Sequence, residues 1–252
     1  MIFVFFLSLI QGITEFIPVS SSSHLIIISN YFDYENQSLT LDVSLHIGSL
    51  IAVVAFFYKD LINIFQKKDL FLKIFIASIP VMTVGFFLIK TNLISKFRDI
   101  EVIGWMTLIF GIFLLLSDKF ELRRNIKNNF SFKFALIIGF FQILSLIPGV
   151  SRSGITISAA RMLKFKRYDA GIISFLLSIP TLGAVSIFGL NNIINSENLG
   201  IFNLNFIAIL CSFLFSFITI KYFLKFLKKF SLKIFFFYRL ILGIILLSLV
   251  YL

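Results

Sequence analysis

Long hydrophobic runs separated by short polar segments dominate the chain. Six of these runs are predominantly apolar along their length: Val43 to Tyr58, Leu70 to Ile89, Val102 to Ser117, Ala170 to Asn191, Asn205 to Leu224 and Ile234 to Leu252. Each is close to the ~20 apolar residues that an α-helix needs to cross a bilayer. The pattern therefore predicts six transmembrane helices.

Two further segments, Ile2 to Asn30 and Phe132 to Leu163, are apolar at both ends but polar in the middle. The first is interrupted by Pro18 and by Ser20 to Ser23, and the second by Pro148 to Ser153. Irregular backbone at membrane depth survives only where protein or a water-filled cavity covers it. We therefore expect two re-entrant helical hairpins whose tips face one another.

The two halves of the chain resemble each other. Each hairpin carries a glutamine ahead of its proline: Gln11 before Pro18, and Gln142 before Pro148. Each half also has a Ser-Ile-Pro string inside a predicted span, ending at Pro80 or Pro180. Three predicted spans separate the hairpins, so the hairpins would enter the membrane from opposite faces. This is an inverted-topology repeat, an architecture that places binding sites near the bilayer midplane.

The composition favours a membrane protein over a soluble one. Of the 252 residues, 59% are hydrophobic and 14% are charged, whereas soluble domains carry about 25% charged residues. A β-barrel would require alternating hydrophobic and polar positions, which the sequence does not show. We therefore predict an all-α polytopic membrane protein that forms a single domain over residues 1–252.

The net charge of +11 does not indicate nucleic-acid binding, because the basic residues are spread among short loops and form no continuous stripe. The surface of an anionic bilayer is the better partner. By the positive-inside rule, the loops near Lys67, Arg123 and Lys228 should be cytoplasmic, while Glu35 and Glu197 should be external. Both termini and the mouth of the first hairpin would then face outward.

Few ionisable residues are predicted at membrane depth, where each is costly and therefore a functional candidate. They are Glu15, His24, His46, Arg152, Arg161 and Arg239. His24 shares a helix face with Ser21 and could transfer a proton, or it could be structural. His46 is more typical of a structural histidine. The arginines at 161 and 239 could add positive potential or extend to an interface.

Gln11 and Glu15 are four residues apart, which places both side chains on one face of a helix. Together they could hold a divalent cation or a water molecule. Glu15 could instead form a structural salt bridge with an arginine, and Gln11 could form a hydrogen bond between helices.

The polar tips are typical of anion-binding sites, because free backbone N–H groups lie at the start of a helix. In the second tip, Arg152 adds a guanidinium that can grip phosphate oxygens in a bidentate manner. One carboxylate, one guanidinium and several hydroxyls suit a diphosphate with a metal ion. The candidate substrate-binding residues are Gln11, Ser20, Ser22, Ser151, Ser153 and Thr156.

Two motifs, QGITEFIPVSSSSHL at Gln11 to Leu25 and PGVSRSGITI at Pro148 to Ile157, resemble the signature motifs of the bacterial undecaprenyl-diphosphate phosphatase family of the bacitracin-resistance type. SFLLSIPTLGA at Ser174 to Ala184 and FYRLILGIILL at Phe237 to Leu247 also look like that family. The resemblance therefore covers nearly the whole chain.

The resemblance implies hydrolysis of a C55 polyprenyl diphosphate in the bacterial inner membrane, helped by Mg²⁺ or Ca²⁺, which recycles the lipid carrier for peptidoglycan synthesis. The family's functional positions map onto Gln11, Glu15, Ser21, His24, Ser151, Arg152 and Thr156. Two positions depart from the family pattern. Gln11 stands where the family often has Glu, which weakens its case as a charged metal ligand. Ser23 replaces the usual Gly, so the tip should not need a positive φ there.

Our mechanistic hypothesis takes Ser21 as the nucleophile, Glu15 or His24 as its base, and Arg152 as the main phosphate ligand. Direct attack by a metal-bound water fits the same residues. The main alternative function is a lipid flippase or small-solute transporter, since inverted repeats with broken helices are transporter architecture. A structural scaffold would leave Glu15 and Arg152 without a purpose, and the sequence leaves a homodimer open.

Overall fold

The computed structural model describes residues 1–252 except 32–38, 67 and 195–198, so Glu35, Lys67 and Glu197 lie outside the described residues. The described residues form helices and no strand, apart from an isolated bridge between Arg124 and Phe165. The predicted all-helical class is thus confirmed. The α-helices are α1 Ile2–Thr14, α2 Ser21–Tyr31, α3 Leu39–Phe56, α4 Tyr58–Gln66, α5 Lys68–Lys90, α6 Ile100–Ser117, α7 Ile126–Asn129, α8 Phe132–Ile143, α9 Arg152–Met162, α10 Arg167–Ile194, α11 Leu199–Lys229 and α12 Lys233–Tyr251. Two short 3₁₀ turns, η1 Leu93–Phe97 and η2 Leu144–Leu146, accompany them.

Five helices of the described chain are long and apolar enough to cross a membrane: α5, α6, α10, α11 and α12. They account for five of the six predicted spans, so the protein is a multi-pass membrane protein. The remaining predicted span is the shorter apolar helix Thr40–Phe56 within α3. Large apolar side chains such as Phe86, Phe188 and Ile241 point outward from these helices, as expected where lipid is the solvent.

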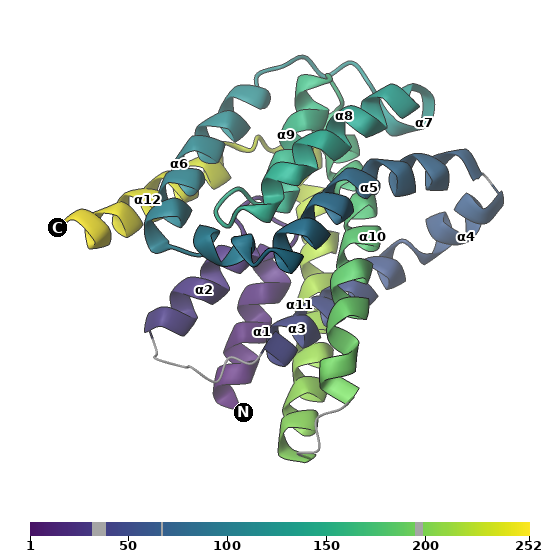
Figure 1. The fold of residues 1–252 in the computed structure, drawn as a ribbon. Coiled ribbons are helices and arrows are strands. Elements are labelled where there is room, and N and C mark those ends of the chain that lie inside the picture. Colours follow the sequence, from purple (N-terminus) through teal and green to yellow (C-terminus); the bar gives the residue numbers. More distant parts are fainter. Residues whose placement is uncertain (32–38, 67, 195–198) are drawn as a thin grey trace.

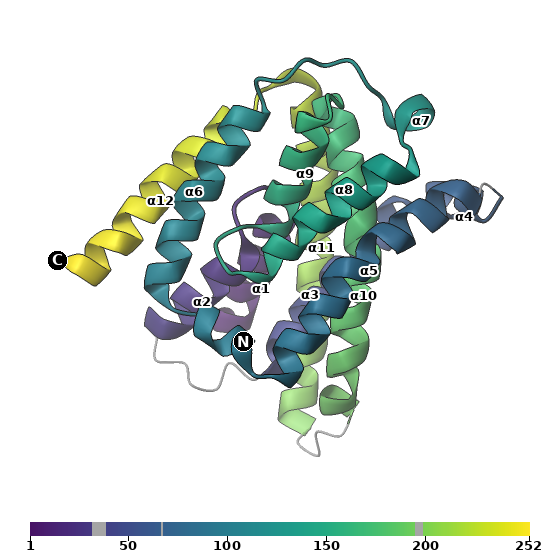
Figure 2. The same ribbon diagram turned by 45° about the horizontal axis from the view of Figure 1, so that its top comes forward.

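Both predicted hairpins are helix–tip–helix units. The first consists of α1 and α2, and the second of α8, η2 and α9. Their arms extend toward opposite ends of the molecule, as Figures 1 and 2 show, while the two tips meet in the middle. A hydrogen bond from the Gly149 N–H to Ser20 Oγ (3.3 Å) joins the tips. The expectation that the tips face one another is therefore confirmed.

The helices around the hairpins pair in a way that fits a repeat. The first arm of hairpin 1, α1, packs on α11, and the first arm of hairpin 2, α8, packs on α5; α3 packs on α10, and α6 on α12. Close approach explains two glycines at these contacts, because a Cβ at Gly12 would overlap α11 at Phe215 and one at Gly139 would overlap α5 at Ala77.

The Ser-Ile-Pro strings are not counterparts in this repeat. Pro80 lies in α5, which follows α3 and α4 after the first hairpin, whereas Pro180 lies in α10, the helix directly after the second hairpin. The similar residues before the two prolines therefore do not identify equivalent helices. The packing of the helices is the better evidence for the repeat.

A buried ion cluster joins the loops at one end of the bundle. Asp118, just after α6, accepts hydrogen bonds from Arg167 Nε (2.6 Å), Arg161 Nε (3.4 Å) and the Leu232 N–H (3.0 Å). These partners bring the end of α9, the start of α10 and the start of α12 together. Arg161 is fully buried within this cluster.

Candidate active site

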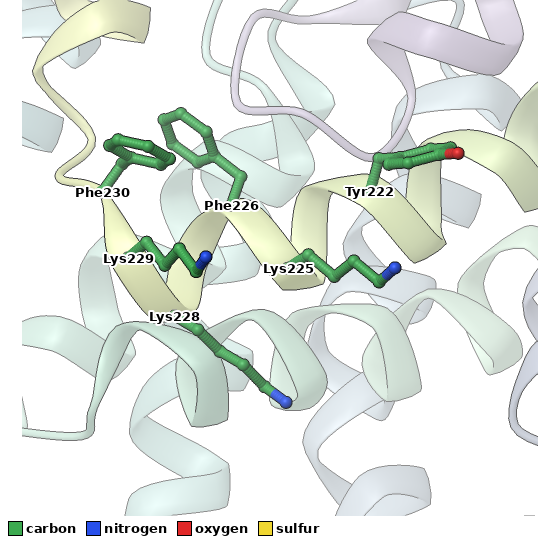
Figure 3. Close-up of a pocket in the computed structure, with 6 residues that line it drawn as sticks. All are labelled: Tyr222, Lys225, Phe226, Lys228, Lys229 and Phe230. Atoms are coloured by element: carbon green, nitrogen blue, oxygen red, sulfur yellow. The ribbon is translucent and has the colours of Figure 1, made fainter.

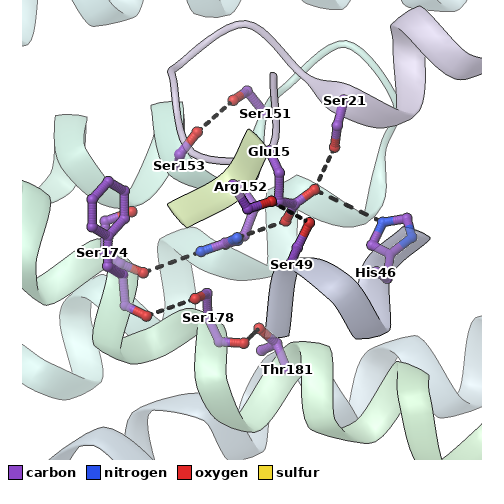
Figure 4. A network of polar contacts seen from close by, with 12 residues as sticks. Glu15, Ser21, His46, Ser49, Ser151, Arg152, Ser153, Ser174, Ser178 and Thr181 are labelled. Carbon is purple, nitrogen blue, oxygen red and sulfur yellow. Dashed lines mark hydrogen bonds and ion pairs between the residues drawn. The ribbon is translucent and has the colours of Figure 1, made fainter. Parts of the chain in front are cut away.

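Glu15 is the centre of the polar network between the two tips. It directly follows α1 and is only 7% exposed. One carboxylate oxygen, Oε2, accepts hydrogen bonds from Ser21 Oγ (2.5 Å) and Gln11 Nε2 (3.0 Å). The other, Oε1, accepts from Arg152 Nη2 (2.6 Å). Figure 4 shows Ser21 and Arg152 reaching the carboxylate from different sides. Both oxygens act only as acceptors here, which is the behaviour of an ionised carboxylate.

Ser21 and Arg152 hold equivalent places in the two tips. Each is the first residue of its second half-helix, α2 or α9. In each tip the preceding residue is a serine with a positive φ, 76° at Ser20 and 70° at Ser151. A left-handed conformation is costly for a residue with a Cβ and is typical of functional turns. Ser23 is not among the positive-φ residues of the described chain, which confirms the expectation at that position.

The other tip serines mostly bind each other and the opposite tip. Ser20 Oγ shares hydrogen bonds with Ser23 Oγ (2.9 Å) and Ser22 Oγ (3.3 Å). Ser153 Oγ donates to the Ile17 carbonyl of the first tip (2.8 Å) and shares a hydrogen bond with Ser151 Oγ (3.2 Å). Ser151 Oγ also caps α9 by accepting from the Gly154 N–H (3.1 Å). These hydroxyls hold the tips together, whereas Ser21 alone among them points to Glu15.

Arg152 is fixed from two sides. Its Nη1 donates to the Ser174 carbonyl in α10 (3.2 Å), and its guanidinium lies 5.9 Å from the centre of the Phe16 ring. A guanidinium has five N–H donors, so these contacts and Glu15 leave capacity for a ligand. Thr156, one turn further along α9, donates to Ser174 Oγ (2.8 Å) and thereby fastens α9 to α10.

His46 lies closer to the centre than the sequence suggested. Its Nε2 is 3.8 Å from Glu15 Oε2, and its Nδ1 is 2.7 Å from the Asp42 carbonyl oxygen. Because a carbonyl only accepts, Nδ1 carries the hydrogen, and Nε2 faces the carboxylate. The signal available in the sequence was a histidine in a predicted span, but only the packing of α3 against α10 and α11 brings it to Glu15.

His24 is turned away from Glu15. Its Nδ1 lies 2.7 Å from the Ser20 carbonyl oxygen, and its Nε2 lies 2.5 Å from the Tyr238 hydroxyl in α12. Both ring nitrogens are thus engaged in the described structure, and no hydrogen bond joins His24 to Ser21 or Glu15 there. The two rings of His24 and Tyr238 stack with their centres 5.8 Å apart.

The donor set for a divalent cation is small. The described residues contain no group of three or more His, Cys, Asp or Glu side chains that could hold a metal ion. However, Gln11 is fully buried and its Oε1 has no hydrogen-bond partner. This acceptor and the Glu15 carboxylate fit a Mg²⁺ or Ca²⁺ ion that takes most of its ligands from water and from substrate phosphates.

A separate hollow of about 340 Å³ lies at the end of α11 (Figure 3). Its lining residues are Tyr222, Lys225, Phe226, Lys228, Lys229 and Phe230. Lys228 also lies over the Tyr168 ring, with its Nζ 4.5 Å from the ring centre. None of the residues of the Glu15 network lines this hollow, so it is not part of the candidate active site.

Comparisons with known proteins show which family this chain is similar to. The family model described as bacitracin resistance protein BacA matches residues 4–245. A protein of Pelagibacter ubique named undecaprenyl-diphosphatase is 45% identical, with 98% of this chain and 97% of that protein covered. Proteins with the same name from Jannaschia sp. (38% identical, 98% of each covered) and Chromohalobacter salexigens (40%, 96% of each covered) are also similar over nearly their whole lengths.

Proposed function

The chain belongs to the family of the bacitracin resistance protein BacA, and from this premise we propose how the Glu15 network performs the reaction. The protein hydrolyses undecaprenyl diphosphate to undecaprenyl phosphate and inorganic phosphate. This returns the carrier lipid to cell-wall synthesis and is consistent with bacitracin resistance. The observation that carries our assignment of the active site is the hydrogen bond from Ser21 Oγ to Glu15 Oε2.

In the first step, Ser21 Oγ attacks the terminal phosphorus of the lipid diphosphate. The Oγ–P bond forms while the bond from phosphorus to the bridging oxygen breaks, and undecaprenyl phosphate leaves with that electron pair. Glu15 accepts the proton from the Ser21 hydroxyl, since its Oε2 lies 2.5 Å away. A nucleophile within hydrogen-bond reach of its base is the arrangement that covalent catalysis requires.

In the second step, water attacks the phosphoserine. The Oγ–P bond breaks, Glu15 returns its proton to Ser21 Oγ, and the oxygen and both hydrogens of the water leave with inorganic phosphate. Glu15 thus acts first as base and then as acid, which a single carboxylate can do because the same oxygen faces Oγ throughout.

Arg152 would hold the terminal phosphate. The side chain lies opposite Ser21 across the Glu15 carboxylate, and a planar guanidinium can bind two phosphate oxygens at once. The N–H groups at the start of α2 and α9 lie at the same place and add positive potential. These features support a site that stabilises the charge of the phosphoryl group during transfer.

We extend this proposal to a divalent cation, Mg²⁺ or Ca²⁺, that would enter with the diphosphate. Glu15 and Gln11 Oε1 would hold it, because the latter is a buried acceptor without a protein partner. Its chemical contribution when bound would be to neutralise phosphate charge.

We also propose that the two hairpins are re-entrant and that α3 is the sixth span, in the bacterial inner membrane. The opposite directions of the hairpin arms support this arrangement. With the basic loops in the cytoplasm, the first hairpin and the active site would open to the outer side.

Release of inorganic phosphate from undecaprenyl diphosphate by the purified protein in detergent tests the function. A flippase or transporter with the same fold would bind the lipid without cleaving it. Turnover by the wild type together with its loss in Ser21→Ala is the expected result, and lipid binding without phosphate release would overturn the proposal.

A further inference from the structure

The middle of α12 carries a fully buried arginine, Arg239, that the reaction described above does not use. No hydrogen bond to a carboxylate is recorded for it in the described structure. Instead, its guanidinium donates to five backbone carbonyls: Gly149 (2.6 Å), Val150 (3.1 Å), Thr107 (3.1 Å), Pro18 (3.3 Å) and Met106 (3.4 Å). The sequence had offered two alternatives for this arginine, positive potential or extension to an interface, and the structure shows its guanidinium hydrogen-bonded inside the protein.

These carbonyls belong to three separate parts of the chain. Pro18 is in the tip of hairpin 1, Gly149 and Val150 are in the tip of hairpin 2, and the other two are in α6. One side chain thus connects both tips to the α6–α12 pair, which lies beside the hairpins in Figures 1 and 2. A charged group at membrane depth is costly, so such a residue marks a functional requirement.

The tip carbonyls that Arg239 binds lie two or three residues before the reacting side chains. Pro18 is three residues before Ser21, and Val150 is two residues before Arg152. Both intervening serines, Ser20 and Ser151, hold the left-handed backbone conformation. Backbone held in that region persists only where its surroundings impose it. The guanidinium binds the carbonyl one residue before Ser151 and the carbonyl two residues before Ser20.

The side chain packs closely against two glycines. A Cβ at Gly154 would lie 3.2 Å from Arg239 Nη1, and one at Gly111 would lie 3.2 Å from Arg239 Cβ. The adjacent Tyr238 reaches the same region, where its hydroxyl meets His24 Nε2 of the first hairpin. Tyr238 and Arg239, which are neighbours on α12, therefore both contact the first hairpin.

We propose that Arg239 is a positioning residue that holds the two tips in register, so that Ser21 and Arg152 meet at Glu15. This rests on the proposed function of the same site. A lysine would keep the charge, but its single ammonium group lacks the planar fork that reaches five carbonyls. Arg239→Lys should therefore misplace the reacting groups without removing any of them.

The test compares Arg239→Lys with Arg161→Lys, which also removes a fully buried arginine but at the Asp118 cluster. Folded protein is isolated by gel filtration, and kcat and KM are measured. We expect kcat of Arg239→Lys to fall by about a hundredfold, the scale of a 1 Å misplacement, with little change in KM. Arg161→Lys should lose thermal stability and keep its kcat. Equal kcat in the two variants would overturn the proposal.

A second readout does not depend on turnover. A single cysteine is placed at position 22 in a Cys211→Ser background, and its rate of alkylation by N-ethylmaleimide is measured. This alkylation rate should rise severalfold when Arg239→Lys is added, but should not change when Arg161→Lys is added. An unchanged rate would overturn the positioning role. If the wild type released no phosphate, the proposed function would fail, but the alkylation rate would still report on the tips.

Arg239→Gln, which keeps two N–H donors without the charge, replaces the lysine variant if that does not fold. Its folded fraction should show the same loss of kcat. If neither Arg239 variant folds while Arg161→Lys and Arg161→Gln do, Arg239 is a purely structural residue and the proposal is wrong.

Discussion

Ser21 Oγ donates a 2.5 Å hydrogen bond to Glu15 Oε2, across a turn that contains Pro18 and the left-handed Ser20. The turn brings together a hydroxyl and a carboxylate that a continuous helix would hold apart, because residues six apart do not share a face. Arg152 from the other hairpin completes the group. The broken helices thus bring the starts of two half-helices to one carboxylate.

Arg152→Lys should lower activity strongly. Lysine keeps one positive charge, but it cannot bind Glu15, the Ser174 carbonyl and two phosphate oxygens in one plane. Loss of one hydrogen bond to a charged group costs about 1.5 to 3 kcal/mol, which is at least about tenfold in kcat/KM. Steady-state phosphate release measures this, and activity within about twofold of the wild type would remove Arg152 from the phosphate site.

His24→Asn and Tyr238→Phe should have effects of similar size on kcat. Each removes the same hydrogen bond between hairpin 1 and α12. In a double-mutant cycle the second change should then add little, because both act on one contact. If His24→Asn alone abolishes turnover and Tyr238→Phe leaves it intact, His24 takes part in proton transfer and our placement of it is wrong.

Gln11→Glu should lower the Mg²⁺ concentration needed for half-maximal activity. It adds a second carboxylate beside Glu15, at the position where Gln11 Oε1 has no partner, and carboxylates are the preferred ligands of hard cations. Gln11→Leu, of similar size, is the matched control and should raise the required concentration. Identical Mg²⁺ titrations for all three proteins would exclude position 11 from the ion site.

Single cysteines in a Cys211→Ser background test the orientation. With a membrane-impermeant maleimide on intact cells, cysteines at 35 and 197 should be labelled, and those at 67, 123 and 228 should be labelled only after the cells are opened. The expectation follows from the excess of Lys and Arg in the latter loops. Labelling at 67 but not at 197 in intact cells would invert the topology.

The tips could be predicted from the sequence because their signals are local. The first half-helices end shortly before Pro18 and Pro148, and serines start or cap the second ones. These are rules of neighbouring residues. A salt bridge between Glu15 and an arginine was one of the alternatives that the sequence left open, and the structure shows it with Arg152.

Other features depend on packing between distant parts of the chain. Tyr238 is 214 residues from His24, and Arg239 binds a carbonyl 221 residues away. His46 reaches Glu15 only because α3 packs against α10 and α11. No periodicity or spacing within one segment carries that information, so these residues had to be located in the structure.

The most direct test of the central claim is to trap the phosphoryl group on Ser21. Labelled undecaprenyl diphosphate is mixed rapidly with the enzyme, the reaction is quenched, and the modified peptide is mapped, with Ser21→Ala and Ser22→Ala as paired variants. We predict label on Ser21, transfer of phosphate to added alcohols, and a loss of kcat in Ser21→Ala greater than the roughly 150-fold that a lost hydrogen bond explains. Two results together would contradict the account and assign the attack to water. Ser21→Ala would retain a few per cent of the wild-type kcat, and the wild type would form neither labelled serine nor an alkyl phosphate.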